Sequence, residues 1–170
     1  MTVMDAIKKR YSCRSYKSIP IEHQKLEKIY QAARLAPSAK NLQDWRFVFV
    51  TDKELKKKLV KAANDQSFLE KAAVIIAACS NCPDTMTCGQ ALGPIDVAIA
   101  LEHIALQAAE LELATCWIGS FFPDQVRKIL QIPSEIGVIE LMALGYPADK
   151  APEPDRVGVE EIISLNKWNF

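Results

Sequence analysis

The sequence predicts an α/β (α+β) protein in which helices cover both faces of a mixed central sheet. Apolar residues recur at helical spacing in several segments, and short β-rich apolar runs lie between those segments. The two kinds of segment alternate along the chain, with no internal repeat and no low-complexity stretch. A chain of 170 residues has the usual length of one domain, so we expect a single domain over residues 1–170.

Six helices are expected, and each has a local reason to begin or end. Pro37 ends the second, because the residue before a proline avoids the helical region. Asp52 is expected to cap the third. The fourth begins around Pro94 and Asp96 and is apolar almost all round, which is typical of a central helix or a subunit interface. The expected ranges are 3–9, 22–35, 52–63, about 94–111, 123–130 and about 159–163.

Four strands are expected, at 47–51, 73–79, 115–118 and 138–144. The run 73–79 is continuously apolar, as in a strand that is covered on both faces. From Ala148 onward the chain is rich in proline and has too few apolar residues to build a second core. We therefore expect an extended C-terminal arm rather than a further domain.

Composition excludes several functional classes. The chain has Lys+Arg 21 and Asp+Glu 21, and this balance argues against nucleic acid as the main partner. The N-terminus lacks the apolar core of a signal peptide. No apolar run reaches the roughly 20 residues of a membrane span, since residues 95–113 carry several charges. Five cysteines, an odd number, fit reduced thiols. We expect a cytoplasmic protein with no membrane partner.

Arg10, Ser12 and Arg14 are the first candidate binding residues. In an extended segment this alternate spacing puts all three side chains on one face. Two guanidinium groups and a hydroxyl on one face make a good cradle for an anion such as phosphate. A solvated basic turn is the alternative interpretation.

Two further segments carry polar groups beside apolar runs. Asn41 and Gln43 offer amide donors and acceptors that can read the edge of a heterocycle, or can merely tie down their own loop. The segment Trp117-Ile118-Gly119 ends a strand at a glycine, where a flat ligand can approach backbone N–H groups. A buried strand with a core tryptophan is the alternative. Arg156 is either a second phosphate ligand or a simple surface arginine.

The order and spacing of these segments resemble the nitroreductase family of FMN-dependent oxidoreductases. The resemblance runs from about residue 4 to residue 163, through "RYSCRSY", "APSAKNLQDWRF", "ATCWIGSF" and "ALGYPADKAPEPDR". The most specific motif is P-S-x-x-N-x-Q-x-W, followed by R-x-S-x-R near the N-terminus. The resemblance implies a three-layer sandwich with a mixed central sheet, and an intertwined homodimer with FMN in two sites at the subunit interface.

The resemblance also implies roles for individual residues. Arg10 and Ser12 would bind the phosphate and ribityl chain, Arg14 would lie on the pyrimidine side of the ring, and Arg156 would close the phosphate site. Gln66 is a weaker candidate for the ring edge. The loop that lines the site, partly from the partner chain, would contribute Pro37, Ser38 and Asn41. The strand beside the ring would contribute Trp117, Ile118 and Gly119.

The activity implied is ping-pong hydride transfer from a reduced nicotinamide, NADH or NADPH, to a nitroaromatic, a quinone or a similar small acceptor. The flavin carries the chemistry, so no catalytic side chain and no metal ligand is named. A flavin-binding protein with a storage, sensing or specialised reductive role is an alternative.

The sequence departs from the family pattern at three positions. Asp44 stands where proline usually follows the glutamine, and it either relaxes the loop or places a carboxylate near the pocket. Glu112 and Ala114 stand where the family commonly has glycines. We expect Glu112 to adopt the left-handed conformation of a helix end, at a cost of about 1 kcal/mol. The chain is also short for the family, which leaves little to build a lid.

The cysteines carry a third hypothesis, a thiol- or metal-based protein. Cys79, Cys82 and Cys88 lie within ten residues, but a single C-x-x-C without a second pair is a weak metal signal. His23 is expected to be exposed at a helix start and His103 to lie on the polar side of the long helix. Neither histidine has a visible partner, so neither is assigned a role.

Overall fold

The structure is a computed structural model that describes residues 1–170. Its α-helices are α1 Val3–Lys9, α2 His23–Arg34, α3 Lys53–Ala62, α4 Phe68–Lys71, α5 Leu92–Glu110 and α6 Pro123–Leu130. Its strands are β1 Arg46–Val50, β2 Val74–Ser80, β3 Ala114–Ile118 and β4 Gly137–Gly145. Two 3₁₀ turns are η1 Ala39–Asn41 and η2 Val159–Glu161. All the expected helices and strands are present, the last helix only as the 3₁₀ turn η2.

The four strands form one sheet in the order β1-β2-β4-β3, and each neighbouring pair runs antiparallel. The only parallel element is a single bridge between Ser12 and Thr115, at the outer edge of β3. The predicted fold class is confirmed, although this one bridge is all that makes the sheet mixed. Strand β2 is buried along its whole length, as its continuous apolar sequence predicts.

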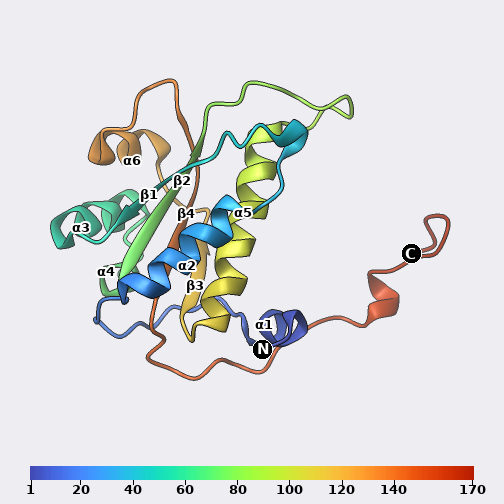
Figure 1. Cartoon of the computed structure of the whole chain (residues 1–170), viewed down its shortest axis with the longest axis horizontal. Coiled ribbons are helices and arrows are strands. Elements are labelled where there is room, and N and C mark those ends of the chain that lie inside the picture. The colour runs from blue at the N-terminus through green and yellow to red at the C-terminus, as the bar shows by residue number, and fades with distance from the viewer.

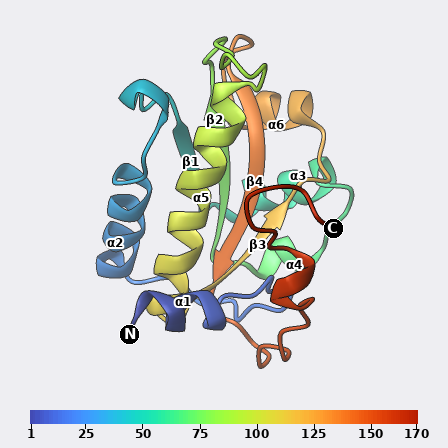
Figure 2. The same cartoon turned by 90° about the vertical axis from the view of Figure 1, so that its right-hand side faces the viewer.

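Two apolar cores lie on opposite faces of the sheet, so the protein has three layers (Figure 2). On one face, α2 and α5 pack through residues such as Ile29, Leu101 and Ile104. On the other face, α3, α4 and α6 pack through residues such as Leu59 and Val126. Side chains of β2 and β4 alternate between the two cores, which follows from the two-residue period of a strand.

The structure confirms the predicted cap of α3 and the predicted end of α5, but α5 begins earlier than the sequence predicts. The Asp52 carboxylate accepts the Leu55 N–H at 2.8 Å and caps α3. Glu112 follows α5 with φ 63, the left-handed conformation that its sequence position predicts. Helix α5 begins at Leu92, two residues before Pro94, because a proline in the first turn removes no helical hydrogen bond. The short elements α4 and η1 have no periodicity that sequence could reveal.

Helix α5 is the one helix that is long and apolar enough, by length and composition, to cross a membrane. More than half of its residues in that window are buried inside the protein, against the sheet and α2. Burial of this kind accounts for its apolar sequence as that of a core helix.

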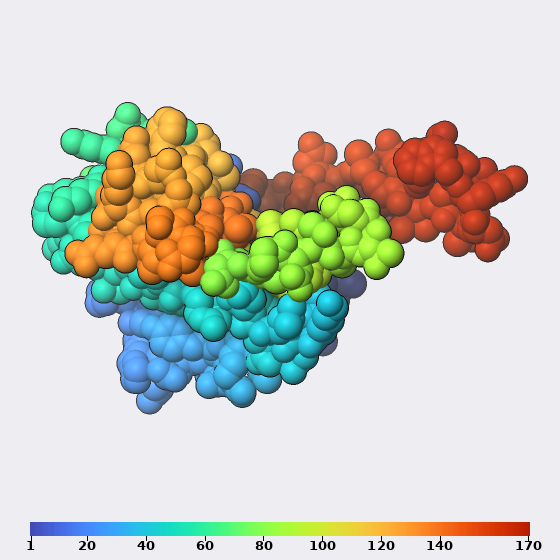
Figure 3. All heavy atoms as spheres, turned by 90° about the horizontal axis from the view of Figure 1, so that it is seen from above, coloured from blue at the N-terminus to red at the C-terminus, as the bar shows by residue number.

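The C-terminal arm, residues 148–170, leaves the body of the molecule (Figures 1 and 3). None of its side chains is buried, although many are large and apolar. The exposed ones are Val157, Val159, Ile162, Ile163, Leu165, Trp168 and Phe170. The predicted extended arm is therefore confirmed, and it carries an apolar surface that the chain itself does not cover.

Candidate functional site

The R-x-S-x-R segment lies along the outer edge of β3. The Cys13 N–H donates to the Thr115 carbonyl oxygen at 2.9 Å, and Ser12 forms the parallel bridge with the same threonine. Thr115 lies only two residues before Trp117. The structure therefore brings the middle of the R-x-S-x-R segment beside the strand that leads into Trp117-Ile118-Gly119.

The two arginines of this segment differ in their partners. Arg10 ends α1, and its Nε lies 3.8 Å from the Glu102 Oε1. Arg14 is exposed and has no carboxylate within 4 Å. Arg14 thus offers an uncompensated charge next to β3, where an anionic group can bind it.

The turn after β3 is held by the segment between α3 and α4. The Gln66 side-chain amide donates to the carbonyl oxygens of Ala63 and Ser120, both at 3.1 Å. The Asn64 amide donates to the Ser120 Oγ at 2.7 Å. Gln66 therefore reaches the turn that follows Gly119, but its amide N–H groups are already used by the backbone.

Gly119 is exposed, and its own chain leaves space around it. A Cβ atom built at this position would meet nothing closer than the Glu140 Oε1, at 3.9 Å. The fold itself does not demand glycine here. Close approach of a ligand to the backbone is a separate reason for glycine at such a position.

Glu140 is a residue that sequence reasoning missed. It lies on β4 beside Ile118 and Gly119, and its Oε1 is covered from solvent without a hydrogen-bond partner. Burial raises the pKa of its carboxyl group, and a hydrogen bond from the Ile118 backbone opposes this only in part. A glutamate in a strand such as "GVIELMALG" has no motif to mark it, so only the structure reveals this group.

The second group of predicted residues lies in the loop between α2 and β1. The Ala39 N–H donates to both carboxylate oxygens of Asp96, at 3.1 and 3.2 Å, and the Gln43 N–H donates to the Ser38 Oγ at 3.0 Å. Asp96 lies near the start of α5, but its carboxylate does not cap that helix. It holds this loop instead.

Asp44 fixes the other end of the same loop. Its Oδ2 accepts the N–H groups of Asn81 and Cys82, at 3.0 and 2.9 Å, and also the Ser80 hydroxyl. Trp45 is buried in the core beside α5 and anchors this end of the loop. The departure from proline at Asp44 therefore does not relax the loop, because it ties the loop to the segment after β2.

Three residues of this loop have left-handed backbone conformations without being glycine. They are Lys40, Asn41 and Gln43, with φ 52, 56 and 53. Such conformations are costly for residues with a Cβ atom and are common at ligand-binding sites. The loop is thus strained and tightly anchored at once.

The two groups of predicted residues do not meet within one chain. The R-x-S-x-R segment follows α1, which packs near the C-terminal half of α5, whereas the loop carrying Pro37, Ser38 and Asn41 is bonded to the first turn of α5 (Figure 1). Arg156 lies on the arm, exposed, and its side chain bonds only to the neighbouring Asp155 carbonyl oxygen. One chain therefore presents three separate parts of the predicted site.

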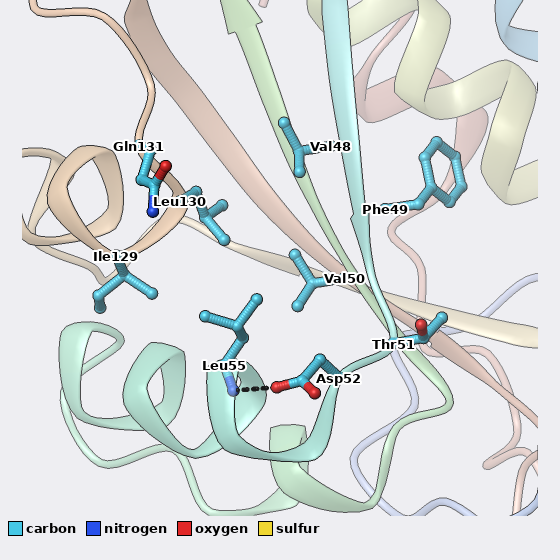
Figure 4. A pocket seen from close by; sticks show the side chains of 9 residues that line it. All are labelled: Val48, Phe49, Val50, Thr51, Asp52, Leu55, Ile129, Leu130 and Gln131. Carbon is cyan, nitrogen blue, oxygen red and sulfur yellow. Dashed lines mark hydrogen bonds between the residues drawn. The ribbon is translucent and has the colours of Figure 1, made fainter.

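One hollow on the surface contains none of the predicted residues. It lies between the end of β1, the start of α3 and the end of α6, with a volume of about 350 Å³ (Figure 4). Its lining is mainly apolar, and its one carboxylate, Asp52, already caps α3. Nothing in it matches the chemistry of an anionic cofactor.

All five cysteines are free. Burial raises the pKa of the Cys79 thiol to about 11, and burial also raises the pKa of Cys116. Cys88 is exposed, on the loop between β2 and α5. No three side chains of His, Cys, Asp or Glu are grouped in the arrangement of a metal site. His23 is exposed at the start of α2, as predicted, with Glu27 at 3.7 Å.

Comparison with known proteins identifies the family. The chain matches the model of the nitroreductase family over residues 7–73 and 63–146. It belongs to this family of oxidoreductases. A relative from Archaeoglobus fulgidus, named for NADH dehydrogenase/NAD(P)H nitroreductase, is 33% identical over 165 residues, which is 94% of each chain.

Solved nitroreductase structures share the fold over nearly the whole chain. A nitroreductase family protein from Clostridium difficile 630 superposes with a TM-score of 0.87 at 33% identity, covering 99% of this chain and 100% of its own. An FMN-dependent nitroreductase from Clostridium difficile R20291 superposes with a TM-score of 0.85 at 29% identity, covering 97% and 99%. The three-layer architecture is therefore that of the nitroreductase fold.

The residues beside β3 fit a flavin nucleotide. Arg14 is an unpaired cation, Ser12 is an exposed hydroxyl, and Gly119 leaves open space against the backbone. A flat ring system needs open backbone, and a nearby guanidinium group stabilises the negative charge of the reduced ring. Both requirements are met by this chain's own residues.

Proposed function

We propose that this protein is an FMN-dependent oxidoreductase that acts as a homodimer in the cytoplasm. It would take hydride from NADH or NADPH and reduce a nitroaromatic, a quinone or a similar small acceptor in a ping-pong cycle. Residues 1–170 would form one nitroreductase-like domain. The observation that supports the proposal is the hydrogen bond from the Cys13 N–H to the Thr115 carbonyl oxygen, which joins the R-x-S-x-R segment to the strand of Trp117-Ile118-Gly119 in a member of this family.

Bound FMN would supply the hydride chemistry, so the protein's own residues need only bind, orient and adjust charge. Arg10 and Ser12 would bind the phosphate and ribityl chain, and Arg156 would join them on the phosphate. Arg14 would place a positive charge at the pyrimidine side of the ring. A cation there favours the reduced, negatively charged cofactor and raises its potential.

Two other groups act on the same region. The exposed backbone of Trp117-Ile118-Gly119 would lie beside the ring. Glu140, behind Gly119, holds its proton to a higher pH than an exposed glutamate does, because burial raises its pKa.

The homodimer is supported by two features of the single chain. The parts of the predicted site are separated, so a second chain is needed to bring Pro37, Ser38 and Asn41 to the residues beside β3. The arm exposes large apolar side chains, of which Trp168 is 83% exposed. An apolar surface of this kind needs a covering partner, and a second copy with the same arm provides one symmetrically.

The test is an absorbance spectrum of the purified protein, with the released chromophore identified by mass. Bands near ~450 nm, a mass matching FMN and rapid oxidation of NADH or NADPH would support the proposal. A flavin without nicotinamide oxidation would favour the storage or sensing alternative. A colourless protein that takes up no FMN, and that holds zinc, would contradict both and favour the cysteine hypothesis.

Arg14→Ala tests the assignment of one residue. We expect weaker FMN retention or slower reduction by the nicotinamide, because the variant removes the unpaired cation. FMN affinity by fluorescence and stopped-flow reduction provide the two readouts. Unchanged affinity together with unchanged kinetics would show that Arg14 is assigned wrongly.

A further inference from the structure

A second and larger hollow lies at the end of the sheet where β2 begins. Its volume is about 1050 Å³. Three segments that are distant in sequence form its walls: residues 14–21, the first turns of α3, and residues 67–74. Figure 1 shows the connection between α1 and α2 passing beside α4 at this end of the sheet. This volume is at the upper end of the range for small-molecule sites.

The walls of this hollow are strongly cationic. Five of the lining side chains are basic and only one, Glu70, is acidic. The basic residues are Arg14, Lys53, Lys56, Lys57 and Lys71. The whole chain has no net charge, so this concentration of positive charge is local. A concave surface lined by one sign of charge focuses the field and attracts the opposite ion.

Most of these cations lack a partner. Lys57 pairs with Glu54 at 2.8 Å, but Arg14, Lys53 and Lys71 have no carboxylate within 4 Å. Cations that are close together and uncompensated repel one another. A bound anion relieves this repulsion.

Lys56 is the centre of the cluster. Its side chain is only 7% exposed, and its ammonium donates to the Ala72 carbonyl oxygen at 2.6 Å. Burial lowers the pKa of Lys56, and the nearby charge of Lys53 lowers it further. A buried ammonium is rare unless it is paired, and here a carbonyl oxygen is its one hydrogen-bond partner.

Apolar side chains share the lining of the hollow with these cations, namely residues 19–21, Leu26 and Phe68. Phe68 stacks on the buried Tyr16, with ring centroids 6.5 Å apart, so its position is set by the core. The hollow therefore offers both cationic groups and an aromatic ring to a ligand.

We propose that this hollow binds a nucleoside phosphate, with its phosphates on Lys53, Lys56 and Lys71 and its base against Phe68 and residues 19–21. Two sources share this chemistry: the adenylate half of the nicotinamide donor, or a separate nucleotide that acts as an effector. The site does not need bound flavin, so it can be tested apart from the proposed function.

The test is calorimetric titration of the full-length protein with ADP, with and without added FMN. The informative variant is Lys53→Gln/Lys71→Gln, which removes two charges from the hollow. The matched control is Lys58→Gln/Lys61→Gln, which removes two exposed charges from α3 outside the hollow. We expect ADP affinity to fall about tenfold or more in the first variant and to stay unchanged in the second.

Titration with pyrophosphate tests whether the base contributes to binding, and kinetics with NADPH or NADH test which nucleotide the hollow binds. Weaker binding of pyrophosphate than of ADP supports the base-binding wall, and equal binding contradicts it. If the hollow variant raises KM for NADPH or NADH at unchanged kcat, the donor is the source. If it changes only ADP affinity, the source is a separate nucleotide.

Three results would overturn the proposal: no saturable ADP binding to the wild-type protein, an equal loss in both variants, or weaker dimerisation of the hollow variant without ADP binding. The last would show that a second copy of the chain fills the hollow. Lys56→Met, which keeps the apolar stem, checks the centre of the cluster, and unchanged ADP affinity there contradicts its role. Failure of FMN to bind would not affect any of these outcomes.

Discussion

The loop that carries Pro37, Ser38 and Asn41 and the C-terminal arm that carries Arg156 differ in how the chain holds them. The loop is strained, but two carboxylates, Asp44 and Asp96, accept five hydrogen bonds from it or its neighbours. The arm contacts the body only at its base, where the Tyr11 hydroxyl donates to the Asp149 carbonyl oxygen at 3.2 Å. The contacts that hold the loop all come from its own chain, whereas most of the arm has no such contacts.

This contrast shows which parts of the site depend on a second copy. A loop held by the buried Asp96 and the half-buried Asp44 keeps its shape before any ligand or partner arrives. An arm with exposed apolar side chains gains its stabilising contacts only on association. Changes in the arm should therefore affect assembly, and changes in the loop anchors should affect the stability of the single chain.

Removing the arm should have the largest effect. A stop after Lys150 deletes Val157, Val159, Ile162, Leu165 and Trp168 but keeps the contact of Asp149. Burial of one such side chain stabilises by about 1.5–3 kcal/mol, so self-association should weaken by ~100-fold or more. Analytical ultracentrifugation measures the dimer, and far-UV circular dichroism checks that the body stays folded. A truncated protein that remains dimeric would contradict the role of the arm.

Asp44→Ala should destabilise the single chain. The variant leaves the N–H groups of Asn81 and Cys82 without their acceptor, and each unsatisfied buried group costs about 1–3 kcal/mol. Because the Asn81 side is exposed to water, we expect a loss of about 2 kcal/mol in urea unfolding. Glu153→Ala is the matched control, since this carboxylate lies on the arm and should change nothing. Equal stability of both variants would show that Asp44 does not anchor the loop.

Glu140→Gln should have a smaller effect that depends on pH. The pKa of Glu140 is raised in the folded state, so the folded protein binds the proton more tightly than the unfolded chain. Stability is therefore lost as pH rises from the unfolded value of about 4.3 through the folded pKa. The glutamine variant lacks this loss and should be more stable at pH 7, by about 1 kcal/mol or less, and not at pH 4. The Tm of the wild-type protein and of the variant, measured at pH 4 and at pH 7, checks this prediction. An equal change in Tm at both pH values would show that the charge of Glu140 is not the cause.

The smallest predicted effect concerns the cysteines, where an exposed and a buried thiol should differ in reaction rate and not in their effect on stability. Cys88 is exposed and should react first with a thiol reagent at pH 8, whereas Cys79 is buried with a pKa of about 11. Its thiolate fraction at pH 8 is about one in a thousand, so its labelling should be slower by far more than tenfold. Mass spectrometry of labelled peptides gives the order. Fast labelling of Cys79 would show that β2 opens readily.

Much of the fold could be predicted from the sequence because local signals and burial agree. Pro37, Asp52 and Glu112 each act within a few residues of their own position in the chain, and the structure confirms all three. Residue patterns also predicted the buried strand β2 and the unsupported arm, since both depend on apolar content alone.

The candidate site was less predictable because its parts act across the chain. Asp96 holds a loop far away in sequence, and the position of Asp44 opposite Ser80 comes from tertiary packing. Lys56 is buried and Glu140 is half-buried, in ordinary amphipathic or apolar segments where no spacing marks them. The residues that the family resemblance assigns lie on three parts of one chain, which no single-chain pattern can join.

The most direct test of the two-chain site is the FMN content of mixed dimers. Arg14→Ala and Asn41→Ala each damage one side of the site, and dimers that carry one chain of each type can be isolated with two affinity tags. If each site takes Arg14 from one chain and Asn41 from the other, one site of the mixed dimer is intact and the other doubly damaged. We predict about one FMN per mixed dimer and little in either parent variant. A mixed dimer as poor in FMN as its parents would show that each site belongs to a single chain.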